Sequence, residues 1–132
     1  MDFVSMADAV RFGLQYERSR VEQASYNLAS ANIAFSSLEE AQALAQSQQA
    51  TFANMLGDFP NMAEQVEMQG IKTVSDPDSP LANAQGEVFY LDVDPVTQMA
   101  TLVSGLRSYE ANVRAYNTLS EINSAALSIG KR

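Results

Sequence analysis

The C-terminal part of the chain carries a helical pattern that is far longer than an ordinary helix. Asp94 followed by Pro95 is a helix start, because the carboxylate accepts hydrogen bonds from exposed N–H groups and Pro at the first position loses none. Gly130 is a suitable end, since Gly permits a left-handed cap. The pattern predicts one helix over 95–130, about 35 residues long against a usual length of about 11 to 12. Such length without a large surrounding domain indicates a coiled coil or a bundle.

An apolar stripe runs along this predicted helix, with polar residues beside it. Met99, Leu106 and Val113 stand seven residues apart, which places them on one face. Glu110 and Asn112 lie within or next to the stripe, where a simple core would use Leu. The polar positions indicate either a marginal helix or a partner surface that needs polar groups at fixed places.

The N-terminal 32 residues predict a second long helix. Apolar residues at spacings of three, four or seven put one face toward a neighbour, namely Val10, Leu14, Val21, Ala24, Leu28 and Ala31. Glu17 interrupts this stripe, and Gly13 costs about 1 kcal/mol of helix propensity relative to Ala. Asn27 has two interpretations: a cap at the helix end, or an amide that bonds to a neighbouring backbone in an assembly.

Residues 33–94 predict shorter elements. Ser37 with Glu40 forms a capping box, so a short helix should run from there to Gly57, before the breaker "GDFPN". "GIKTV" and "GEVFYLDV" have the β-branched and aromatic content of strands, and the Pro-containing stretch between them is a loop. These two strands predict a small β-hairpin.

The expected fold is mainly α, as one domain over 1–132. Long N- and C-terminal helices (1–32 and 95–130) pack as a coiled-coil-like pair, with a β-hairpin and a short helix in the acidic middle region 33–94. The chain of 132 residues is long enough for one domain with a modest core.

Composition argues against an enzyme. The chain contains no Cys and no His, which removes thiolate chemistry, most metal ligands and the commonest general base. Tyr109 beside Glu110 could suggest a catalytic pair, but Tyr109 is better explained by a buried ring with a hydrogen-bonded hydroxyl. Glu110 has an Arg as its expected partner, the candidates being Arg18, Arg107 and Arg114. No catalytic residue, cofactor or small-molecule substrate is expected.

The charge distribution argues against nucleic acid and calcium as ligands. The net charge is −8, and between Ile33 and Pro95 the only basic residue is Lys72, against ten acidic residues. No basic stripe exists to meet phosphates, and the acidic middle is expected to be a solvated face. The aspartates at 76, 78, 92 and 94 lack the spacing of a calcium loop and are better explained as turn and cap residues, so no metal is expected.

Neither a signal peptide nor a membrane span is expected. Asp2 and Asp8 stand where a positively charged leader segment would lie, and no apolar run reaches transmembrane length. The chain is expected to be cytosolic or exported by a route that does not use such signals.

Three segments resemble the bacterial flagellar basal-body rod proteins, most closely those of the proximal rod. "ASYNLASAN" is similar to the pattern that ends the family's first helix. "DPDSPLANAQGEV" followed by "VDP" resembles its central stretch. "RSYEANVRAYNT" and the later "LSIG" resemble the signature and the ending of its C-terminal helix.

The resemblance implies a structural subunit whose terminal helices build an inner tube with other copies and other axial proteins. It also implies export through the flagellar type III apparatus, a periplasmic place in the basal body and a part in motility. The polar positions of the long helix would then fix register between subunits. The candidate interface residues are Leu14, Val21, Asn27, Leu28, Asn32, Met99, Leu106, Tyr109, Glu110, Asn112, Val113 and Tyr116. The alternative is a cytosolic helical adaptor or export chaperone that binds a flagellar partner.

Overall fold

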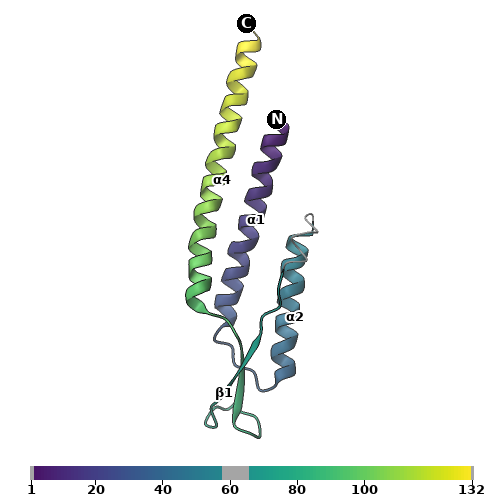
Figure 1. The fold of residues 1–132 in the computed structure, drawn as a ribbon, viewed down its shortest axis with the longest axis vertical. Coiled ribbons are helices and arrows are strands. Elements are labelled where there is room, and N and C mark those ends of the chain that lie inside the picture. The colour runs from purple at the N-terminus through teal and green to yellow at the C-terminus, as the bar shows by residue number, and fades with distance from the viewer. Residues whose placement is uncertain (1, 58–65, 132) are drawn as a thin grey trace.

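The fold is built on two long antiparallel helices. The computed structural model describes residues 2–57 and 66–131. Helix α1 (Phe3–Ser30) and helix α4 (Pro95–Gly130) lie side by side, and α4 projects beyond the N-terminal end of α1 (Figure 1). The predicted mainly α fold, with a small hairpin between the terminal helices, is confirmed.

Helix α1 begins at a side-chain cap, and it continues beyond Asn27. The Asp2 carboxylate accepts from Ser5 N at 2.8 Å, which satisfies one of the first free N–H groups. Asn27 lies inside the helix, which continues to Ser30, and its side chain is buried. The prediction that Asn27 caps this helix is therefore wrong.

Helix α4 begins where the sequence predicts. Asp94 accepts from Val96 N at 3.1 Å and from Thr97 Oγ1 at 2.7 Å, and Pro95 occupies the first turn. The predicted left-handed cap at Gly130 is wrong, because Gly130 ends the helix without a positive φ. Among the described residues, the one glycine with a positive φ is Gly86.

Glycines bring α1 and α4 close together. A Cβ added to Gly105 would lie 2.9 Å from Val21 Cγ2, which is closer than carbon atoms pack. A Cβ added to Gly13 would lie 3.0 Å from Asn112 Nδ2. Gly13 lowers the helix propensity of α1, but it permits a close helix contact that a larger residue would obstruct.

Helix α2 (Leu38–Met55) lies on the side of α1 that faces away from α4 (Figure 1). Ser37 caps it by accepting from Glu40 N at 3.2 Å, as the capping box predicts. Near its C-terminal end, Phe52 is buried and its ring lies 5.9 Å from the ring of Tyr26 on α1. The breaker predicted at residues 57–61 lies mostly outside the described residues.

The predicted hairpin consists of β1 (Ile71–Ser75) and β2 (Glu87–Leu91). The strands are antiparallel, and their register runs from Ile71 opposite Leu91 to Ser75 opposite Glu87. Strand β1 is largely exposed, whereas β2 buries Val88 and Leu91 completely. Leu91 packs with Ala45 of α2, so a small core holds the hairpin against the short helix at the lower end of the molecule (Figure 1).

A search of the described residues for a membrane-crossing helix finds none with the necessary length and apolarity.

Candidate assembly interface

The face of α4 that touches α1 carries a line of small and polar residues. Gln98, Gly105 and Asn112 stand seven residues apart and all meet α1. Gln98 Oε1 accepts from Asn27 Nδ2 at 3.1 Å, and the other two pack at the glycine contacts. We call this face the inner seam. It fixes how α1 and α4 pair within one chain.

The predicted apolar stripe lies beside the inner seam and is not part of it. Met99 and Leu106 are 58% and 46% exposed, and Val113 is half-buried. Each follows an inner-seam residue by one position, and one position turns a helix by about 100°. The stripe was expected to face a neighbouring helix, but α1 leaves Met99 and Leu106 exposed.

Predicted residues on α1 fall in several environments. Leu14, Val21 and Leu28 are half-buried, and Val21 contacts α4 at Gly105. Asn27 is 2% exposed, and its Oδ1 has no hydrogen-bond partner among the described residues. Asn32 follows the helix and is exposed. Val21 and Asn27 thus belong to the helix pair, Leu14 and Leu28 are partly covered, and Asn32 is open to solvent.

Tyr109 and Glu110 differ from expectation. The Tyr109 side chain is 38% exposed and has no hydrogen bond within the described part of the chain, so the predicted buried, hydrogen-bonded ring is wrong. Glu110 is also exposed and has no ion pair there. Its candidate partner Arg18 is bound to Glu22 of the same helix, at 3.0 Å between Nε and Oε1. Glu110 lies about 140° around α4 from Gly105 and so stands on the open side. Tyr109, in contrast, is one turn from both Gly105 and Asn112 and lies at the edge of the inner seam.

Tyr116 completes the contacts toward the N-terminal end of α1. The guanidinium carbon of Arg11 lies 6.0 Å from the centre of the Tyr116 ring, which is cation–π distance. The hydrogen bond with Tyr116 raises the pKa of Arg11 above its ordinary value. The contact joins the two helices beyond Gly13.

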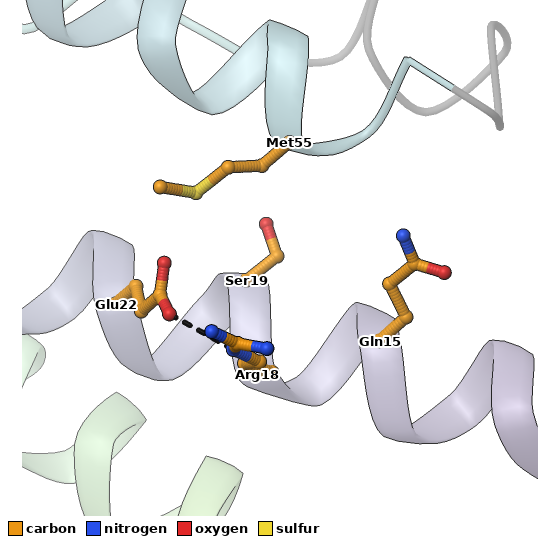
Figure 2. A pocket seen from close by; sticks show the side chains of 5 residues that line it. All are labelled: Gln15, Arg18, Ser19, Glu22 and Met55. Atoms are coloured by element: carbon orange, nitrogen blue, oxygen red, sulfur yellow. Dashed lines mark hydrogen bonds and ion pairs between the residues drawn. The ribbon is translucent and has the colours of Figure 1, made fainter.

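A shallow cleft lies between α1 and the C-terminal end of α2. Figure 2 shows Met55 reaching from α2 across a space toward α1, with Ser19 opposite and the ion pair of Arg18 and Glu22 beside it. Gln15 lines the other end. The lining offers an exposed ion pair and a thioether, which suit packing and not bond-breaking chemistry.

Two aspartates, Asp2 and Asp94, cap the starts of the long helices. The hydrogen bond from Thr97 lowers the pKa of Asp94 below its ordinary value of 3.8, and the backbone of Ser5 does the same for Asp2. The backbone N–H of Asp76 bonds to the Gly86 carbonyl at the open end of the hairpin. Within residues 2–57 and 66–131, no three acidic side chains gather as metal ligands would.

The sequence predicted one partner of each close contact between α1 and α4, namely Val21, Asn27 and Asn112. It did not predict Gly105 and Gln98, because apolar periodicity does not include a glycine or an amide. The available signal was the seven-residue spacing of Gln98, Gly105 and Asn112. A repeat of small and polar residues can define a close seam as well as an apolar one.

Comparison with known proteins points to the flagellar rod. Residues 84–129, which include β2 and nearly all of α4, match the family described as flagellar basal body rod FlgEFG protein C-terminal. The similar curated proteins include the flagellar basal-body rod protein FlgC of Bacillus subtilis, which is 52% identical over 58 residues, 44% of this chain and 39% of that protein. FlgC of Aquifex aeolicus is 36% identical over 64 residues, 48% of each chain, and FlgC of Escherichia coli O157:H7 is 38% identical over 71 residues, 53% of each chain.

The chain spans about half the length of the curated relatives that it matches. No solved structure matches it. In the matched segments the chain is similar to flagellar basal-body rod proteins. Among these it is similar to FlgC in particular, and the resemblance noted from its motifs is confirmed.

Proposed function

We propose that this protein is a structural, non-enzymatic subunit of the bacterial flagellar rod. It assembles through α1 and α4 with other copies and other axial proteins, and it contributes to flagellum-dependent motility. The similarity to FlgC supports the class of protein, and the geometry of α4 supports the mode of action.

The observation that carries the proposal is the exposed apolar side of α4. Val96, Met99, Val103 and Leu106 are separated by three or four residues and so share one side of the helix. All four are exposed, although they lie within the segment that matches the rod family. A long helix that presents such a stripe gains stability when a neighbour covers it.

The proposed place of action is the periplasmic rod of the basal body. By analogy with rod proteins, the chain would reach it through the flagellar type III export apparatus and not by a cleaved signal peptide. The candidate residues on the open side of α4, including Leu106 and Glu110, would then contact neighbouring subunits. Asn112 and the other inner-seam residues would hold the helix pair in the shape that assembly requires.

The test is a tagged copy of the full chain in the source bacterium. We expect the protein in purified basal bodies, and we expect deletion of its gene to abolish complete rods and swimming. The matched control is a strain that carries the tagged gene in place of the deleted one, which should swim. If the protein stays in the cytosol bound to one flagellar partner and is absent from basal bodies, the structural role is wrong and the adaptor or chaperone alternative is correct.

A further inference from the structure

The outward side of α4 has a hollow with a simple helical geometry. Its central lining residues have the spacing i, i+3, i+4 and i+7, and they are Ala100, Val103, Ser104 and Arg107. Residues three and four apart are surface neighbours, so four residues at this spacing surround one gap, the kind that receives a side chain in coiled coils. Val103 and Arg107 lie about 160° around the helix from Gly105, so the hollow faces away from α1.

Helix α1 has a hollow with the same spacing. Its lining includes Glu22, Ser25, Tyr26 and Ala29, which again occupy positions i, i+3, i+4 and i+7. Ser25 and Ala29 are exposed, and the Tyr26 side chain is 51% exposed even though its ring meets Phe52. Each hollow therefore combines two small residues with a larger apolar one that can enter a facing gap.

The fourth residue of each hollow carries a charge, and the two charges are opposite. Arg107 is exposed and has no ion pair among the described residues. Glu22 pairs with Arg18, whose side chain is 73% exposed, so that pair is worth little and leaves the carboxylate able to accept a second cation. Charge complementarity thus adds to the matching shapes.

We propose that the occupant of each hollow is a second copy of this chain, with α4 of one copy packed on α1 of the next. The inference rests on the proposed function and names the contact through which copies meet. An antiparallel arrangement places Arg107 opposite Glu22 and Ser104 opposite Ser25. A parallel arrangement would place Arg107 opposite Ala29, so the charges select the antiparallel one.

The contact is heterologous, because the two hollows lie on different helices of each copy. Every added copy leaves one hollow free on either side, so the contact can propagate. Within a copy Val21 faces Gly105, which puts Glu22 level with position 104. Between copies Glu22 would be level with Arg107, three residues further, which is an axial shift of about 4.5 Å per copy.

Disulfide trapping tests the arrangement, since the chain has no Cys of its own. Purified Ser25→Cys and Ser104→Cys proteins are mixed at high concentration and oxidised gently. We expect the mixed pair to give at least about tenfold more linked dimer than Ser25→Cys mixed with Ser47→Cys, an exposed control position on α2. Equal yields for the two mixtures, or a dominant link between two Ser104→Cys chains, would overturn the arrangement.

Charge reversal tests the pairing of the two hollows independently. Arg107→Glu and Glu22→Arg should each weaken self-association in sedimentation experiments by about tenfold, and the double variant should recover most of that loss. Circular dichroism of each variant establishes that the helices are retained, and Arg114→Glu on the same helix is the matched control. Failure of the double variant to recover, with all variants folded, would show that the two residues do not meet.

Experiments in the cell distinguish a failure of this contact from a failure of the proposed rod role. A protein present in basal bodies whose Ser25→Cys and Ser104→Cys variants never cross-link there would overturn this contact and leave the rod role standing. Absence from basal bodies would overturn the rod role itself.

Discussion

Two faces of one helix, α4, differ in the kind of contact that each can make. The inner seam is built from Gln98, Gly105 and Asn112, which are small or polar and lie against α1. The outward side carries Met99 and Leu106, which are large, apolar and exposed. Large apolar residues therefore stand on the outward side, whereas the closest contacts with α1 are made by small and polar residues.

This difference teaches that the helix pair combines close approach and polar contacts with half-buried larger residues such as Val21 and Tyr116. Several large apolar side chains of α4 remain exposed on its outward side. Burying apolar surface contributes roughly 25 cal/mol per Å², so covering the outward side would stabilise the helix pair further. A subunit of this kind is built to be completed by others.

The largest expected effect comes from a substitution in the inner seam. Gly105→Leu would place a side chain where a Cβ already lies 2.9 Å from Val21 Cγ2, so the helices must separate. We expect a loss of about 1–3 kcal/mol in the free energy of unfolding, measured by urea denaturation. Gly130→Ala is the control, because nothing lies within 4 Å of a Cβ there, and it should cost nothing. Equal stability of both variants would mean that the seam is not a close contact.

A smaller effect is expected at the buried amide of the seam. Asn27→Ala removes the hydrogen bond to Gln98 and should cost about 1 kcal/mol. The same substitution also removes Oδ1, which has no partner among the described residues. Thermal unfolding decides between these contributions, with the exposed Asn32→Ala as the control. A more stable variant would show that the unpaired oxygen outweighs the hydrogen bond.

A substitution on the outward side should leave folding nearly unchanged. Leu106→Gln alters a side chain that is nearly half exposed, so the free energy of unfolding should move by no more than about 0.5 kcal/mol. Incorporation into basal bodies should nevertheless fall, because the substitution removes part of the apolar stripe. Quantitative blotting of basal bodies, beside total protein from the same cells, measures both quantities. Normal incorporation would remove the distinction between the two faces.

The smallest effect concerns the cap at the start of α4. The pKa of Asp94 is lowered in the folded protein, so its contribution to stability is present above the ordinary value of 3.8 and is lost as the pH falls through the lower folded value. Asp94→Asn keeps a capping side chain but does not titrate. The difference in stability between the two proteins should therefore narrow below pH 3.8. A constant difference down to lower pH would show that the carboxylate charge adds nothing to the cap.

The sequence predicted the elements well because their boundaries depend on local chemistry. Asp94 with Pro95 and Ser37 with Glu40 act within one turn of a helix, and the structure confirms both starts. The strands of the hairpin likewise followed from their own residue types. Element boundaries are fixed by neighbours in the chain, which a single sequence contains.

Which side of α4 meets α1 was harder to predict. Periodicity shows which residues share a face, but not which of two faces meets α1. The apolar line through Met99 and Leu106 was the natural choice, yet Gly105 permits a closer contact one position away. Choosing between them needs the position of Val21 on the other helix, which depends on tertiary packing. The candidate interface was thus predicted on the correct helix, while the roles of its two sides came from the structure.

The contact at Gly105 also influences the position of the far end of α4. Helix α4 has 36 residues and is therefore about 54 Å long, and Gly105 lies about a third of the way along it. A side chain inserted there would push the helices apart about 10 Å from the contact at Asn112. Because the end of α4 lies about 27 Å beyond Asn112, it would move between about two and three times as far. The absence of a Cβ at Gly105 therefore affects the direction in which the end of α4 points, more than 30 Å away.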